Sequence, residues 1–159
     1  MDARELLVDT IAHIRPAHAV EHLTPEDAER RVPGANHSIA EIVAHLNFWA
    51  GWFCDRCEGI HAPMVTSAAS RWPAVVPGSW PELHARFLTT LNRAVALGDD
   101  PGRLASRLIP AIEFPPLANY TIRDAIIHMG THNAHHLGQI IILRQLMGLW
   151  PPPSGSWTW

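Results

Sequence analysis

The amino-acid sequence predicts an all-α protein, a four-helix bundle, and two observations carry the prediction. The prolines leave three long windows free of proline, at residues 34–62, 82–100 and 117–150. Within each window the apolar residues recur every three or four positions, which is the spacing of an amphipathic helix. Helices with apolar seams of this kind pack together as a bundle. Because 47% of the 159 residues are hydrophobic, we expect one domain over residues 1–159.

An N-terminal helix is expected from about residue 3, with Leu7, Ile11 and Ile14 on its apolar face. Pro16 should end or kink this helix, because proline cannot donate an intrahelical hydrogen bond. This segment is the first of the four predicted helices.

The other three helices begin near the proline-free windows, and each start carries two residues with the spacing of a capping box. The pairs are Ser38 with Glu41, Ser79 with Glu82, and Thr121 with Asp124. Gly98 and Gly148 are placed to cap the C-terminal ends of the third and fourth helices. The connections at 59–79 and 99–118 are long for a bundle, and loops of that length often surround a functional site.

The composition excludes several classes of function. A formal net charge of −3 gives no electrostatic basis for binding nucleic acid or an anionic membrane. No apolar run approaches the roughly 18–20 residues of a membrane span, and the first residues lack the pattern of a secretory signal. We therefore expect a cytoplasmic protein. All twelve basic residues are arginine, which excludes a lysine Schiff base and a P-loop lysine.

Eleven histidines make imidazole the first candidate for chemistry, because histidine is the commonest metal ligand and titrates near neutral pH. On the last helix, His132 and His136 lie one turn apart and about 40° apart around the axis, at an otherwise apolar seam. Such a pair can chelate one cation. Spacing also permits His128 and His135 as ligands, but their stripe is more polar and is predicted to form the outer face or an interface.

A third ligand should come from another helix, and His45 lies beside the apolar seam of the second helix. Three imidazoles can hold Zn²⁺ or Ni²⁺ and leave one position open for water. The alternative is that His45, His132 and His136 are hydrogen-bonded core histidines. Glu41 can either orient the metal shell or complete its capping box. For Gln139, packing is favoured over contact with metal-bound water.

Cys54 and Cys57 form a C-x-x-C motif, which invites comparison with redox proteins. They are expected late in the second helix, where the helix dipole does not stabilise a thiolate. Cys54 lies about 180° around that helix from His45 and cannot join the same site. A redox role is therefore not favoured.

Two segments resemble the DinB/YfiT-like superfamily of metal-dependent proteins. Residues 34–46, GANHSIAEIVAHL, are similar to the second helix of that family, and residues 132–140, HNAHHLGQI, to its last helix. The tail from residue 150 to 155 also resembles endings common in the family. The resemblance implies the family's mirror-type up-and-down bundle, a homodimer, and a divalent metal bound by His45, His132 and His136.

The resemblance also implies a function, because family members include isomerases and transferases that use a low-molecular-weight thiol. We expect a metal-dependent enzyme that acts on a small-molecule substrate by group transfer, isomerisation or hydrolysis. The rival interpretation is a non-catalytic stress-response protein that binds metal. The sequence identifies neither the substrate nor the general base.

Overall fold

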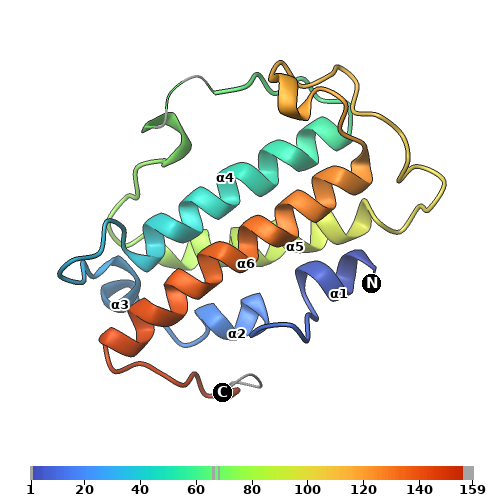
Figure 1. The fold of residues 1–159 in the computed structure, drawn as a ribbon. Coiled ribbons are helices and arrows are strands. Elements are labelled where there is room, and N and C mark those ends of the chain that lie inside the picture. The colour runs from blue at the N-terminus through green and yellow to red at the C-terminus, as the bar shows by residue number, and fades with distance from the viewer. Residues whose placement is uncertain (1, 66, 68, 156–159) are drawn as a thin grey trace.

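The computed structural model describes residues 2–65, 67 and 69–155, and the regular secondary structure within these residues is helical (Figure 1). Within them there is no strand, and the β-type pairing is a single isolated bridge between Arg107 and Thr121. The predicted all-α class is therefore confirmed. Among the described helices, none has the length and the hydropathy required to cross a membrane.

The helices that the structure describes are six α-helices and two short 3₁₀ helices. In chain order they are α1 (Ala3–Leu7), α2 (Pro16–Val20), α3 (Pro25–Glu29), α4 (Ile39–Cys57), η1 (Ala69–Arg71), α5 (Trp80–Ala96), η2 (Pro115–Leu117) and α6 (Ile122–Leu146). The three longest, α4, α5 and α6, match the three windows in which the apolar period predicted helices, although α5 begins two residues before its window and includes Pro81.

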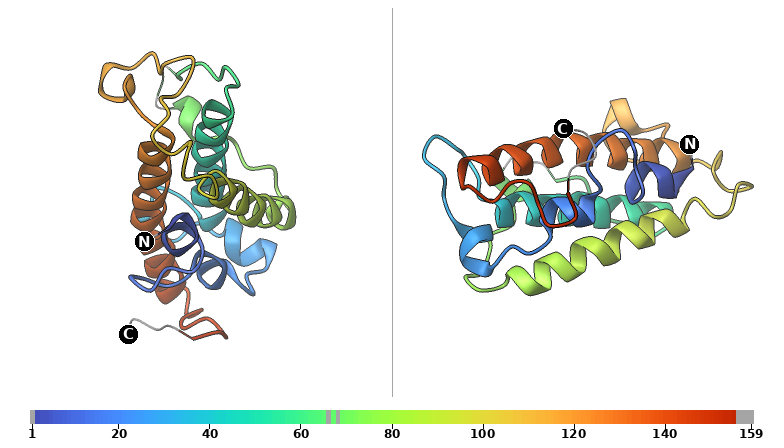
Figure 2. Two further views of the ribbon diagram at one scale, coloured as in Figure 1. Left: turned by 90° about the vertical axis from the view of Figure 1, so that its right-hand side faces the viewer. Right: turned by 90° about the horizontal axis from the view of Figure 1, so that it is seen from below.

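The long helices lie side by side, and the short N-terminal helices close the remaining side. Helix α4 contacts both α5 and α6. The short helices α1 and α2 also contact both α5 and α6. Figure 2 shows α1 and α2 between α5 and α6, on the side away from α4. In Figure 1, α4 and α5 run in the same direction and α6 runs against them. Both long connections pass along the same side of the α4–α6 pair.

The N-terminal segment departs from the predicted single helix. Helix α1 ends at Leu7, and Ile11, which was expected on the apolar face, is 94% exposed. Pro16 does not end a helix but begins α2, where its missing N–H costs nothing because the first N–H groups of a helix have no intrahelical partner. Leu7 and Ile14 are buried as expected.

Two of the three predicted capping boxes form, those of Ser38 with Glu41 and Thr121 with Asp124. The third prediction is wrong, because the Ser79 side chain makes no capping hydrogen bond. Gly148 has a φ of 73° directly after the end of α6, as expected of a C-terminal cap. Gly98 serves close packing, because a Cβ there would lie 2.4 Å from the Cβ of Ala3.

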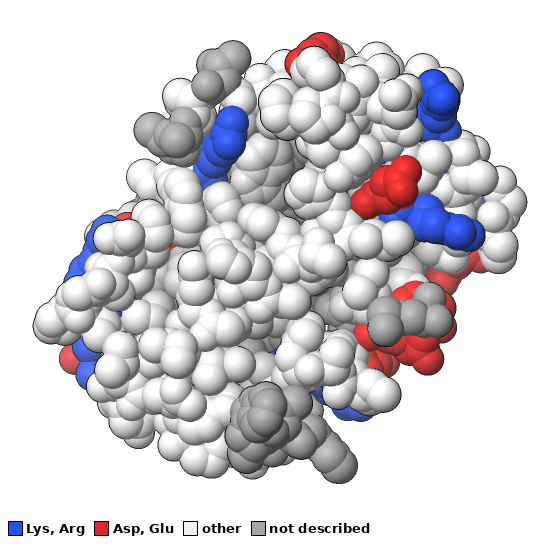
Figure 3. All heavy atoms as spheres, in the orientation of Figure 1, with Lys and Arg blue, Asp and Glu red and all other residues white. Residues whose placement is uncertain are grey.

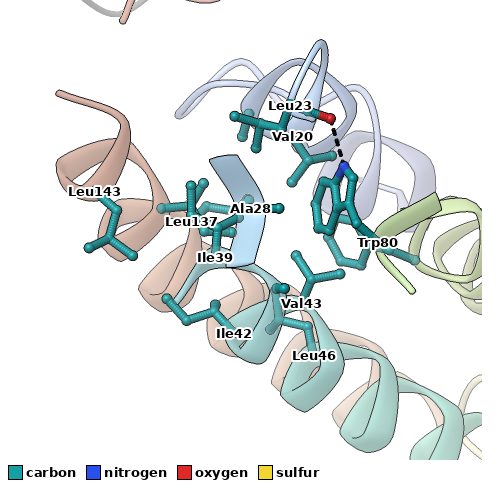
Figure 4. Packing of buried hydrophobic residues seen from close by; sticks show 14 of the residues in the cluster. Val20, Leu23, Ala28, Ile39, Ile42, Val43, Leu46, Trp80, Leu137 and Leu143 are labelled. Carbon is teal, nitrogen blue, oxygen red and sulfur yellow. Dashed lines mark hydrogen bonds between the residues drawn. The ribbon is translucent and has the colours of Figure 1, made fainter. Parts of the chain in front are cut away.

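The core consists of two clusters of buried apolar side chains, one towards each end of the α4–α6 pair. In the cluster around the start of α4, Val20 and Leu23 lie beside Trp80, and Leu143 of α6 lies at the opposite side of the cluster (Figure 4). The indole N–H of Trp80 donates to the Leu23 carbonyl at 2.8 Å, which fixes the start of α5 against the chain between α2 and α3. The three histidines of the predicted metal site lie on α4 and α6, between the residues that these helices contribute to the two clusters.

Candidate metal centre

The structure brings His45 of α4 together with His132 and His136 of α6. The Nε2 atom of His132 lies 3.2 Å from Nε2 of His45 and 3.2 Å from Nε2 of His136. One nitrogen from each ring falls within 4.8 Å of the other two. His45 and His136 are buried, and His132 is partly buried. Of the histidine, cysteine and acidic side chains in the described residues, these three are arranged so that they could hold a metal ion together.

The hydrogen bonds of the outer ring nitrogens determine which nitrogens face the centre. Nδ1 of His45 lies 2.6 Å from the main-chain oxygen of Arg71, and Nδ1 of His136 lies 2.7 Å from Oε1 of Gln139. Both partners are acceptors, so each Nδ1 carries the proton and donates, and each Nε2 presents a lone pair. The Nε2 atoms of His45 and His136 both present lone pairs to Nε2 of His132, which has at most one proton to share between them. A cation between the three Nε2 atoms would satisfy all of these lone pairs.

Burial keeps these imidazoles in the neutral form that binds metals. Desolvation, together with the neighbouring histidines, lowers the pKa of His132 to about 3. Desolvation also lowers the pKa of His136 to about 4, although the hydrogen bond to Gln139 opposes this shift. The pKa of His45 is lowered as well, chiefly by desolvation. At neutral pH, protons therefore do not compete for the three Nε2 atoms.

The connection between α4 and α5 supports the site through two consecutive residues. The main chain of Arg71 accepts the hydrogen bond from His45, and the Trp72 ring stacks on the His45 ring at a centroid distance of 4.0 Å. Trp72 also stacks on His37 on its other face, at 3.6 Å. The sequence placed Trp72 in a long linker but gave no signal for this stacking, which depends on the path of the folded loop.

A cavity of about 420 Å³ opens beside the three histidines. Its walls come from α4, α6 and both long connections and are mostly aromatic or apolar; they include Trp49, Phe53, Met64, Trp72, Phe114 and Leu117. Arg71 lines the cavity too, whereas no described aspartate or glutamate does. On the face seen in Figure 3, charged side chains lie mainly towards the edges, and the middle of the face is largely uncharged.

His128 belongs to this cavity, contrary to the prediction that it lies on the outer face or at an interface. Its ring packs 4.8 Å from the Phe53 ring, and its Nδ1 lies 3.0 Å from the Tyr120 hydroxyl. The connection that precedes α6 supplies Tyr120 and so covers this part of the helix. His135, on the same stripe, is exposed as predicted and lies outside the metal-binding group.

The structure also decides the roles of the two residues near the ligands. Glu41 completes the capping box of α4 and forms an ion pair with Arg31, while His45 takes its hydrogen bond elsewhere. The packing role expected for Gln139 is wrong, because its exposed side chain accepts the hydrogen bond from His136. The i, i+3 spacing of 136 and 139 on one helix is the signal that could have identified this contact.

Replacing Gln139 by leucine is expected to lower zinc affinity about 10- to 100-fold, because the acceptor that orients His136 is lost. Competition with a chromophoric chelator measures the affinity. Gln145→Leu is the matched control, an exposed glutamine on the same helix outside the metal-binding group. Equal affinities for the two variants would contradict an orienting role for Gln139.

The two cysteines are expected to be unreactive in the folded protein. Cys54 and Cys57 are free and buried, and burial raises the pKa of each thiol to about 12. At pH 8 both thiols therefore stay protonated, and a thiol-specific reagent should label them slowly. Both should react rapidly once guanidinium chloride unfolds the chain. Rapid labelling of the native protein would show that one of them is an accessible thiolate.

The chain matches the model of one known protein family. No curated protein and no solved structure matches the chain. The model of the DinB superfamily matches residues 12–140, a span that contains the three converging histidines and all three long helices except the last turns of α6. The chain therefore belongs to the DinB superfamily.

Proposed function

We propose that His45, His132 and His136 bind one divalent transition-metal ion through their Nε2 atoms. The observation that carries this proposal is the convergence of three neutral imidazoles, two of which have their Nδ1 protons held by oxygen acceptors. Zinc and nickel are the proposed ions, because both accept three imidazole ligands. Cellular supply of the two metals decides which of them is bound.

The chain is further proposed to be a metal-dependent enzyme. The support is the cavity of about 420 Å³ beside the ligands, a size within the range of roughly 300–1,000 Å³ for small-molecule sites. Three protein ligands leave a position for a group from solution. A divalent ion held there would supply Lewis acidity to a water molecule or a thiol. Transfer or isomerisation with a low-molecular-weight thiol, and hydrolysis, are the reaction classes proposed.

His128 is the residue proposed to move a proton in this cavity. It lies one turn before His132 on α6, and its ring lines the cavity together with the three ligands. Tyr120 is within hydrogen-bonding distance of its Nδ1, so Nε2 of His128 is left to meet a substrate. Burial lowers the pKa of His128, which keeps the imidazole neutral and able to accept a proton.

Cobalt substitution distinguishes this enzyme from a non-catalytic stress-response protein that only binds metal. The visible spectrum of the Co²⁺ protein should change when N-acetylcysteine is added, because the fourth position is open to a thiol. A spectrum indifferent to thiols and to anions would indicate a site closed by protein ligands and favour the non-catalytic function. His135→Ala serves as the control that removes an imidazole from α6 outside the site.

A four-helix bundle is proposed as the finer description of the fold, with α1 and α2 together in the place of one helix. The contacts of these two helices with both α5 and α6 support it.

A homodimer is also proposed, supported by Ile142 and Leu146, which are 54% and 65% exposed beside a groove of about 530 Å³. Sedimentation equilibrium should give twice the 17.7 kDa mass, and a monomer at high concentration would contradict it.

A further inference from the structure

Arg71 is held beside the three histidines by its own main chain and by its neighbour. Its carbonyl oxygen accepts the hydrogen bond from His45, and Trp72, the next residue, stacks on the same imidazole. The position of Arg71 is therefore linked to the position of a proposed ligand. Arg71 lines the same cavity as the three histidines.

The guanidinium group of Arg71 is oriented but has no polar partner among the described residues. Its carbon lies 5.9 Å from the centroid of the Trp49 ring, within the distance of a cation–π contact. The Nε atom is buried and makes no hydrogen bond with any residue that the structure describes. No described aspartate or glutamate lies within ion-pair distance of this side chain, and none lines the cavity.

Two other arginines show what the fold does with a buried guanidinium. Arg56 forms an ion pair with Glu113, and Arg144 donates to the carbonyl oxygens of Ala19 and Leu149. Both are used to fasten segments of the chain together. Arg71 has no such partner in the described part of the chain, and its guanidinium lies near Trp49, which lines the same cavity as Arg71.

We propose that Arg71 binds the carboxylate of a small organic acid whose apolar part fills the aromatic cavity. The planar guanidinium matches a carboxylate, to which it can donate two parallel hydrogen bonds. The rings of Trp49, Phe53 and Phe114 provide the surface for an apolar body. This assignment names the substrate class of the enzyme proposed above and rests on that proposal for its catalytic meaning, while carboxylate binding itself can be measured without the metal.

The experiment measures the binding of benzoate and of its neutral analogue benzamide by isothermal titration calorimetry. Wild type, Arg71→Gln and Arg71→Lys are each titrated in zinc-loaded and zinc-free form, with zinc content determined for every sample. Arg86→Gln is the matched control, because it removes one positive charge from an exposed position on α5. Circular dichroism confirms that each variant is folded.

Arg71→Gln should weaken benzoate binding about 10- to 100-fold, with benzamide binding and zinc content unchanged. Arg71→Lys should retain part of the affinity, because the charge remains but the paired donors are lost. Arg86→Gln should bind benzoate like the wild type.

Three results would overturn this inference. The first is benzoate binding that Arg71→Gln does not change, which with zinc present would show that the metal alone holds the anion. The second is equal weakening of benzoate and benzamide, which would show that Arg71 acts only as a wall. The third is inorganic phosphate binding as tightly as benzoate. If the wild type takes up no zinc, the proposed metal site fails, but the inference still predicts Arg71-dependent benzoate binding to the zinc-free chain.

Discussion

Replacing His132 by alanine is expected to lower zinc affinity by more than about 100-fold, because His132 is the ring that faces both other ligands. Its Nε2 atom lies 3.2 Å from the Nε2 atoms of His45 and His136. Loss of an orienting contact alone costs about 10- to 100-fold, so loss of a ligand should cost more. Chelator competition on protein purified without a histidine tag measures the affinity.

The control is His135→Ala, because His135 is an exposed histidine of the same helix. This variant should bind zinc like the wild type and should keep the rise in melting temperature that excess zinc produces. A ligand that binds only the folded state at about 1,000 times its dissociation constant adds about 4 kcal/mol of stability. His132→Ala should lose this increment. Equal zinc binding by the two variants would refute the assignment of His132.

Replacing Arg56 by alanine is expected to reduce the free energy of unfolding by about 2–5 kcal/mol, in the range of other large truncations in a core. The Arg56 side chain has no exposed surface. Its guanidinium donates to the Pro110 carbonyl at 3.3 Å and forms an ion pair with Glu113. These bonds hold the connection that carries Phe114 to the cavity, so the variant should also alter the cavity wall. Urea unfolding followed by circular dichroism measures the change.

Glu113→Gln is the control for the charge of this ion pair. The Glu113 side chain is 50% exposed, and glutamine keeps an acceptor for Arg56, so the loss of stability should be much smaller. A loss as large as that of Arg56→Ala would show that the charge of the pair, and not the packing of the arginine, stabilises the connection.

The sequence was sufficient to predict the long helices and the three converging histidines. Both depend on periodicity along a regular helix, where residues three and four apart share a face. The apolar seam of α6 is interrupted at Asn133 and His136, and from this pattern His132 and His136 were predicted to point towards the interior. The same argument on α4 placed His45 beside its seam.

The surroundings of the site could not be predicted in the same way, because they depend on irregular segments. The carbonyl of Arg71 and the ring of Trp72 reach His45 only through the folded path of a long connection. His128 was misassigned because the polarity of its stripe does not reveal that Tyr120 and Phe53 cover it. The N-terminal segment was misassigned because a proline can begin a helix as well as end one, and Pro16 begins α2.

X-ray absorption spectroscopy of the zinc-loaded, untagged protein tests the proposed metal centre most directly. One zinc ion per chain is predicted, with imidazole nitrogens at about 2.0–2.1 Å and a further light-atom ligand from solution. The scattering should contain no sulfur at about 2.3 Å, because neither Cys54 nor Cys57 belongs to the group of described side chains that converge with the three histidines. A sulfur ligand, or failure of the protein to retain zinc, would contradict a metal centre formed by His45, His132 and His136.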